Sequence, residues 1–356
     1  MIKKESFDLV WIKTFNEKPQ KANPEIIEKE IYALKLLELL AETGLDFVFK
    51  GGTCLSLILQ EFTRFSIDID ITTSIQEKDI DQYLSKLKYE DIFTDFKEQE
   101  RNRRGKLIKR HYKFFYNSAH YNGKEEYVIL DIVFENTHYH EIENTKIDFL
   151  LLKSEEPYLT VKTPSLNNIL IDKLTAFAPE TIGITYQTEK YMEIIKQMYD
   201  VSKISKKIQE EHINIDLYKK LANVQIENRI LDINYKDALV DTIYTALNIL
   251  TKGFYSKDKY AMLEGAINGF RGYVYGNKFT QNDAEDAAID ALYVATIILV
   301  GNLNTFNAYS KESIELKDIK SFSKVLKYLK GVHSFTGQYV KLEKSLKNLV
   351  LMGVIS

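Results

Sequence analysis

The sequence has little of several residue types, and each scarcity excludes a class of structure. Cys54 is the single cysteine in 356 residues, so no internal disulfide framework can form. All five prolines lie at or before Pro179, so the rest of the chain lacks the strongest helix breaker. The formal net charge is only −3, so no overall positive field attracts nucleic acid, and any such binding requires local basic patches.

Long apolar runs are also missing. The apolar run Ala291–Gly301 near the C-terminus is shorter than the roughly 20 residues that span a bilayer, so it predicts a buried helix. The first residues lack the apolar core and small-residue cleavage site of a secretory signal. We therefore expect a cytoplasmic protein without a membrane segment.

The length and the hydrophobic patterns predict two domains of different class. A chain of 356 residues with 45% hydrophobic residues is long enough for about two packed cores. Two strand-like runs, Lys106–Tyr116 and Glu126–Asn136, flank an Asn-Gly turn signal and predict an antiparallel pair. Helical patterns dominate after about residue 180. We predict an α+β fold, with a mixed sheet and flanking helices in residues 1–180 and an all-helical domain in residues 181–356.

The stretch KGGTCLSLILQEFTRFSIDIDI, from Lys50 to Ile71, predicts a site. A short apolar strand, Leu45–Phe49, runs into a glycine pair, and an apolar helical pattern follows. Isoleucines then alternate with Asp68 and Asp70, which is the period of a half-buried strand with both carboxylates on one face.

This arrangement suits the chemistry of nucleotide phosphates. Mg²⁺ prefers a few carboxylates and keeps its other positions for water and phosphate oxygens, as Asp68 and Asp70 would allow. A glycine turn at a helix N-terminus lets backbone N–H groups approach phosphate oxygens. Asp131, on a strand face shared with apolar residues, is the candidate third carboxylate for the metal. The residues predicted to cradle the phosphates are Gly51, Gly52, Thr53 and Ser56.

The helical half contains a candidate cation. Lys173 lies in the middle of an apolar helical stripe, where its charge must reach water or meet an anion such as a triphosphate. Lys196 and Asp200 lie one helical turn apart. Two basic segments, Arg101–Lys113 and the lysine-bearing helix face Lys317–Lys330, are candidates for RNA contact or are simply solvated surface.

Three segments in this order resemble the AbiEii/AbiGii-type toxin family of the nucleotidyltransferase superfamily. They are the stretch from Lys50 to Ile71, then LIDKLTAFA, then KQMYDVSKI, and the resemblance covers about residues 25–205. It implies a nucleotidyltransferase-like fold, an NTP substrate, Mg²⁺, and a toxin role in toxin–antitoxin or phage-defence systems with a separately encoded antitoxin. For some relatives the acceptor is the 3′ end of tRNA.

The resemblance also implies roles for individual residues. It places Gly51, Gly52 and Thr53 at the nucleotide phosphates, Arg64 and Ser66 beside the metal strand, and Asp68 and Asp70 on Mg²⁺. It places Lys173 on the nucleotide and makes Asp200 the acidic group of the last motif. Gln197 departs from the pattern, because the family usually has an aspartate there.

Two alternatives compete with an RNA-modifying toxin. One is a catalytically degenerate nucleotide-binding module that regulates a partner, which the departure at Gln197 favours. The other is a small-molecule nucleotidyltransferase of the aminoglycoside-modifying type, which needs an acidic pocket for a cationic acceptor. The basic segment Arg101–Lys113 favours RNA over such an acceptor.

Overall fold

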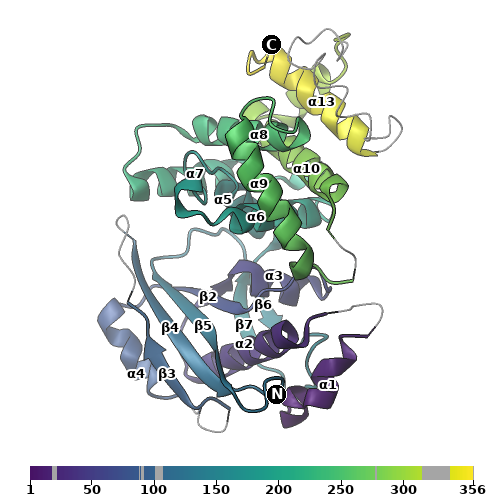
Figure 1. Cartoon of the computed structure of the whole chain (residues 1–356). Helices are drawn as coiled ribbons and strands as arrows, with labels where there is room; N and C mark the ends of the chain where they lie inside the picture. Colours follow the sequence, from purple (N-terminus) through teal and green to yellow (C-terminus); the bar gives the residue numbers. More distant parts are fainter. Residues whose placement is uncertain are drawn as a thin grey trace. The chain divides into compact units, whose positions relative to one another are not determined.

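The protein divides into two compact units, one built around a sheet and one helical (Figure 1). The computed structural model describes residues 1–17, 22–87, 89, 92–100, 107–276, 279–314 and 337–355. Unit 1 consists of Met1–Ile169 and Gly272–Lys278, and unit 2 of Leu170–Arg271 and Phe279–Ser356. The predicted α+β class, a mixed sheet with flanking helices followed by helices, is confirmed.

Unit 1 contains a seven-stranded sheet with the order β3-β4-β5-β2-β1-β7-β6. The strands are β1 (Val48–Lys50), β2 (Asp68–Thr73), β3 (Asp95–Glu98), β4 (Ile108–Asn117), β5 (Glu125–Phe134), β6 (Ile142–Lys146) and β7 (Thr160–Pro164). β2 is parallel to β5 and β1 is parallel to β7, while the other neighbours are antiparallel. The expected β4–β5 hairpin is confirmed, and Asn122 and Gly123 in its turn both have positive φ.

Helices cover one face of this sheet. The helices of unit 1 are α1 (Leu9–Thr14), α2 (Pro24–Glu42), α3 (Gly51–Leu59) and α4 (Ile80–Leu84). The side chain of Asn23 caps α2 and Pro24 is its first residue, as the start signals predict. Tyr32 of α2 stacks on Tyr116 of β4 with ring centroids 3.6 Å apart. The helix-covered face therefore carries the fully buried residues Ile69, Ile71, Phe114 and Leu130, while Asp68, Asp70, His111 and Asp131 lie on the opposite face.

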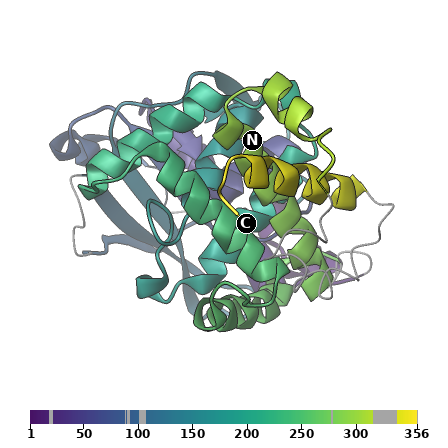
Figure 2. The ribbon, with the colours of Figure 1, turned by 90° about the horizontal axis from the view of Figure 1, so that it is seen from above.

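Unit 2 is helical throughout its described residues. Its helices are α6 (Tyr191–Ser205), α7 (Ile215–Arg229), α8 (Tyr235–Leu250), α9 (Lys257–Phe270), α10 (Gln281–Val300), α11 (Leu303–Tyr309) and α13 (Gly337–Leu351), and α5 (Leu166–Ala176) leads into the unit. α10 packs against α6, α8, α9, α11 and α13 and is therefore the central helix of the unit. Figure 2 shows the green and yellow helices of this unit from above. The apolar run Ala291–Gly301 forms most of its buried length, as expected.

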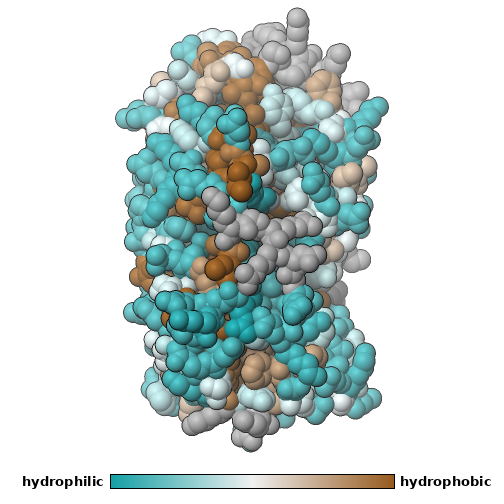
Figure 3. Space-filling view, turned by 90° about the vertical axis from the view of Figure 1, so that its left-hand side faces the viewer, coloured by the Kyte–Doolittle hydropathy of each residue, from teal (hydrophilic) through white to brown (hydrophobic). Residues whose placement is uncertain are grey.

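No single helix of the described residues is long and apolar enough to cross a membrane. One sharply bent pair, α10 with α11, passes a test of length and composition, and α10 is a buried core helix. On the face seen in Figure 3, hydrophilic residues predominate and hydrophobic ones form small, separate patches.

The element boundaries differ from the sequence expectation in a few places. The apolar pattern predicts a strand over Leu45–Phe49, whereas β1 begins at Val48 and ends at Lys50. The difference arises because hydrogen bonding to β2 and β7 determines where the strand begins and ends. The short strands β3, β6 and β7 lie at the sides of the sheet and were not predicted. β3 and β6 are polar and largely exposed, and the short β7 has only Val161 as a large apolar residue, so neighbouring strands stabilise all three.

Candidate active site

Four residues with ionisable side chains form a row across the polar face of the sheet in unit 1. Lys50 of β1 is opposite Asp70 of β2, Asp70 is opposite Asp131 of β5, and Asp131 is opposite His111 of β4. Directly opposed residues have side chains on the same face. Asp68 precedes Asp70 by one full pleat, so it shares this face. The structure thus brings the three predicted carboxylates together on one surface.

Two basic residues of the neighbouring strand β4 lie on the same face as these carboxylates. Nδ1 of His111 lies 2.6 Å from Oδ1 of Asp131. On the same strand, Lys109 faces Asp131 and Asp70. Loss of contact with water and the positive charge of the nearby Lys50 lower the pKa of the Lys109 ammonium. The negative charges of Asp131 and Asp70 oppose that shift.

Lys50, Lys109 and His111 are members of the site that the sequence patterns above do not predict. The signal that could have found the last two is their alternation on a basic strand beside an acidic one. The sequence indicates only a basic segment, whose residues 101–106 lie outside the described residues, as does the whole lysine face Lys317–Lys330.

The glycine pair packs directly against the site. Gly51 has φ of +85°, and a Cβ built on it would lie 2.2 Å from Oδ2 of Asp70. A Cβ on Gly52 would lie 2.5 Å from Oγ of Ser66 and 2.6 Å from Nη2 of Arg64. Neither position tolerates a side chain, because the backbone must pass this close to Asp70 and Arg64. The turn therefore places the N-terminus of α3 beside the carboxylates.

Thr53 joins the turn to the carboxylate strand. Its hydroxyl is buried and donates to the carbonyl oxygen of Asp68 at 2.7 Å. Lys50, the N-cap residue of α3, makes no side-chain cap hydrogen bond. Backbone N–H groups at such a helix start favour an anion, which suits the predicted phosphate position.

A segment from far along the chain holds Arg64. The residues Gly272–Gly276, which follow α9, pair with the segment before β2: Phe65 N–H donates to the carbonyl of Tyr273 at 2.8 Å, and Tyr275 N–H to that of Thr63 at 3.3 Å. Arg64 is buried, and its guanidinium donates to the carbonyl of Phe65 at 3.0 Å. Nothing in the local sequence pattern predicts this return.

Behind Arg64 lies a buried carboxyl group, Glu30 of α2. The hydroxyl of Tyr275 donates to its Oε2 at 3.0 Å, while its Oε1 has no hydrogen-bond partner among the described residues. Burial raises the pKa of the Glu30 carboxyl to about 8, although the Tyr275 hydroxyl and the charge of Arg64 oppose the shift. Glu30 is therefore a proton-binding group close to neutral pH.

We expect Glu30 to make the stability of the protein pH-dependent. Between its ordinary pKa of 4.5 and the raised value, the folded protein binds a proton that the unfolded chain does not. The free energy of unfolding therefore falls as pH rises through this range, by up to about 1.4 kcal/mol per pH unit. Urea unfolding of Glu30→Gln at pH 5, 6, 7 and 8 should show a flatter profile. Parallel profiles for the variant and the original protein would contradict this.

The two predicted residues of the helical half form an ion pair within unit 2. Nζ of Lys173 in α5 lies 3.1 Å from Oδ2 of Asp200 in α6, and the side chains are 7% and 1% exposed. Lys173 thus meets an anion in the protein itself rather than reaching water. Lys196 pairs with Glu193 at 2.7 Å. Gln197, the departure from the family pattern, is buried.

The side chains on the polar face are of the chemical type that binds Mg²⁺. Asp68, Asp70 and Asp131 supply hard oxygen donors on one surface, and the glycine turn keeps the space next to Asp70 free of side-chain atoms. Among the described residues, no group of three or more acidic, histidine or cysteine side chains already converges on one point, and Asp131 is turned toward His111. Metal binding would therefore require the side chain of Asp131 to turn away from His111.

Comparison with known families decides the class of this enzyme. The sequence matches the family described as "Nucleotidyl transferase AbiEii toxin, Type IV TA system" over residues 35–258. The match covers more than half of the chain and includes the glycine turn, the three carboxylates, and the Lys173–Asp200 pair. This chain belongs to the AbiEii family.

The AbiEii family is one of nucleotidyltransferase toxins, so the chain is a nucleotidyltransferase, as its sequence predicts. The return segment Gly272–Gly276 lies beyond the part of this AbiEii protein that the family match covers. The contacts around Arg64 are therefore features that the family match does not describe.

Two solved structures from Helicobacter pylori resemble this AbiEii protein. One, JHP933, is 16% identical with a TM-score of 0.43, and the alignment covers 80% of this chain and 99% of that one. The other, whose name describes it as a candidate nucleotidyltransferase, is 16% identical with a TM-score of 0.43 and coverage of 78% and 98%. Among curated proteins, none matches the chain.

Proposed function

We propose that this AbiEii protein transfers a nucleotide from an NTP to a hydroxyl group of RNA, with the tRNA 3′ end as the acceptor, in a Mg²⁺-dependent reaction. The observation that supports this most is the position of Asp68, Asp70 and Asp131 on one sheet face beside a glycine turn that has no room for side chains. We further propose that it acts in the cytoplasm as the toxin of a two-gene phage-defence system, paired with a separate antitoxin.

In this proposal the backbone N–H groups of Gly51, Gly52 and Thr53 bind the phosphates that leave. Asp68, Asp70 and Asp131 would hold Mg²⁺, which neutralises charge on the triphosphate. Arg64 and Ser66, packed against Gly52, keep the turn in place. Lys173 and Asp200 are assigned to nucleotide binding on the strength of the family motifs.

The transfer itself is a single displacement at phosphorus. The acceptor hydroxyl oxygen forms a bond to the α-phosphorus while the bond from that phosphorus to the bridging oxygen breaks, and pyrophosphate leaves. The proton of the hydroxyl passes to the carboxylate of Asp131 once this side chain has turned from His111 toward the reacting group. Positioning of the reacting groups and neutralisation of charge provide most of the rate enhancement in this kind of reaction.

A labelling experiment tests the proposal. The purified protein is incubated with Mg²⁺, total cellular RNA and each of the four labelled NTPs in turn, and the products are separated on a denaturing gel. We expect label on an RNA band of tRNA size that disappears with EDTA. NTP binding without labelled product would instead favour the regulatory module, and label only on an added aminoglycoside would favour the small-molecule enzyme.

A further inference from the structure

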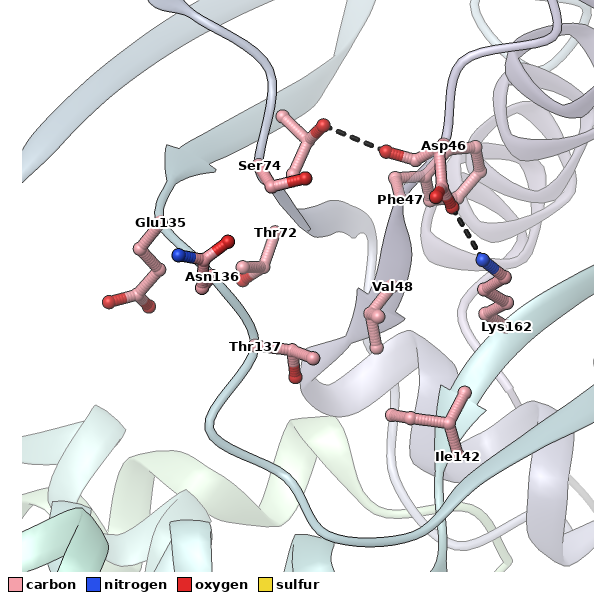
Figure 4. Close-up of a pocket in the computed structure, with 11 residues that line it drawn as sticks. Asp46, Phe47, Val48, Thr72, Ser74, Glu135, Asn136, Thr137, Ile142 and Lys162 are labelled. Atoms are coloured by element: carbon pink, nitrogen blue, oxygen red, sulfur yellow. Dashed lines mark hydrogen bonds and ion pairs between the residues drawn. The ribbon is translucent and has the colours of Figure 1, made fainter.

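A cavity of about 530 Å³ opens in unit 1 where β1, β2 and β5 meet the segment after β5 (Figure 4). In Figure 4, Glu135 and Asn136 lie on one side of it, Val48 and Lys162 on the other, with Thr72 between them. A volume of this size is typical of small-molecule sites. None of its lining residues was predicted to be functional.

The cavity lies on the same sheet face as the carboxylates. Thr72 follows Asp70 by one full pleat on β2 and is opposite Val48, while Asp70 is opposite Lys50. Both positions therefore face the same side of the sheet, about 7 Å apart along the strand. Because the glycine turn follows Lys50, it lies on the other side of Asp70. Along β2 the order is thus the glycine turn, the carboxylates and then the cavity.

This order matches the geometry of phosphoryl transfer. The attacking and leaving oxygens lie roughly in line on opposite sides of the phosphorus. If pyrophosphate leaves into the glycine turn and the phosphorus lies at the carboxylates, the acceptor hydroxyl must arrive from the side of Thr72. The cavity occupies that side.

The lining indicates an uncharged ligand with hydroxyl groups. The hydroxyl of Thr72 is buried, with the residue 4% exposed, and it has no hydrogen-bond partner among the described residues. An unpaired buried hydroxyl is costly unless a ligand completes it. Asn136, Thr137 and Ser74 add further neutral polar groups, and Val48 and Ile142 provide an apolar wall against which a base can lie.

The charged groups of the cavity already have partners. Oδ1 of Asp46 accepts from Lys162 at 2.7 Å, and Oε2 of Glu135 lies 3.3 Å from Nε2 of His138. Both carboxylates therefore already contact a basic side chain, so neither is left without a partner to receive the cationic acceptor that an aminoglycoside-type enzyme requires.

We propose that this cavity is the acceptor subsite and that it takes the 3′-terminal ribonucleoside of an RNA. The proposal rests on the proposed function, since it needs the phosphorus at the carboxylates and the pyrophosphate at the glycine turn. The cavity holds the terminal ribose and base, and directs a ribose hydroxyl toward Asp70 and Asp131.

Filling the cavity gives the first test. Ile142→Trp places a large side chain at the cavity wall from the exposed edge strand β6, where folding should be unaffected. Glu143→Trp is the matched control, because the next residue along a strand points to the opposite face. We expect Ile142→Trp to raise the KM for RNA at least about tenfold while the KM for NTP stays the same, and the control to change neither.

Removing the hydroxyl group of Thr72 gives the second test. Thr72→Val keeps the shape but removes the unpaired group, so thermal stability should stay the same or rise. The KM for RNA should nevertheless increase by about tenfold, which corresponds to one lost hydrogen bond. Thr72→Ser, which restores the hydroxyl, should recover most of that loss. A purely structural role for Thr72 predicts no recovery of this kind.

The outcomes separate this inference from the proposed function. If the original protein labels no RNA, the proposed function fails and the subsite fails with it. If RNA is labelled but Ile142→Trp and Thr72→Val leave its KM unchanged, the subsite alone is wrong. If the two variants raise the KM for NTP instead, the cavity is a nucleotide site. If the original protein labels an added aminoglycoside and the two variants lose that labelling, the cavity binds a cationic acceptor. Either result overturns the assignment to a ribonucleoside.

Discussion

Asp70→Asn should reduce nucleotide transfer by a factor of about 10³ or more while the protein remains folded. Asp70 is the central member of the charged row, opposite both Lys50 and Asp131, and it packs against Gly51. The substitution removes a negative charge and a metal-binding oxygen where positive charge must be held against the triphosphate, and losses at such positions are typically of this size or larger. The measurement is the initial rate of RNA labelling at saturating NTP.

The structure explains why this effect should be separable from unfolding. Asparagine keeps the size and one oxygen of the side chain, and removing one of two adjacent carboxylates also relieves repulsion with Asp131. We expect the free energy of unfolding to change by less than about 1 kcal/mol. Asp95→Asn on the edge strand β3, whose carboxylate pairs with Lys97 in partial exposure, is the matched control and should keep full activity. Transfer at the original rate in Asp70→Asn would remove Asp70 from the catalytic site.

Lys173→Met should destabilise the protein by about 3–5 kcal/mol, the usual cost of leaving one member of a buried ion pair without its partner. The substitution leaves Asp200, which is 1% exposed, without the ammonium that lies 3.1 Å away. For a unit of this size, the melting temperature should fall by roughly 10 °C. Thermal unfolding followed by circular dichroism measures the effect directly.

Two further variants identify the cause of that loss. The double variant Lys173→Met/Asp200→Leu should recover much of the stability, since no unpaired charge stays buried. Lys219→Met removes a lysine from an exposed pair with Asp216 and should leave the melting temperature unchanged within error. If Lys173→Met melts like the original protein, the Lys173–Asp200 pair is not a structural element, and nucleotide binding becomes the better account of its burial.

The buried pair also bears on the alternative of a degenerate module. A pair that stabilises unit 2 can persist without catalysis, so its presence alone does not distinguish an enzyme from a regulator. The carboxylates of unit 1 differ from this pair, because three of them share one face of the sheet. These carboxylates are only half-buried and lie beside a glycine turn that leaves no room for a side chain. The activity of Asp70→Asn is therefore the sharper test.

Local pattern alone determined much of this protein. The alternation of isoleucine with Asp68 and Asp70 identified the site strand and its polar face, because neighbouring side chains on a strand point to opposite sides. The glycine pair identified the turn, because only glycine allows such a close backbone approach. The start signals of α2 and the Asn-Gly turn of the β4–β5 hairpin were also predictable, since each depends on a few adjacent residues.

Tertiary structure decided the remainder, because it depends on which distant segments pair and in what register. Only the register of four strands places Lys50 and His111 in one row with the carboxylates. Only the return of Gly272–Gly276 to unit 1 puts Tyr275 against Glu30, and the energy of that contact is absent from any local window. The cavity at Thr72 likewise exists only where several strand ends meet, and no sequence period records such a meeting.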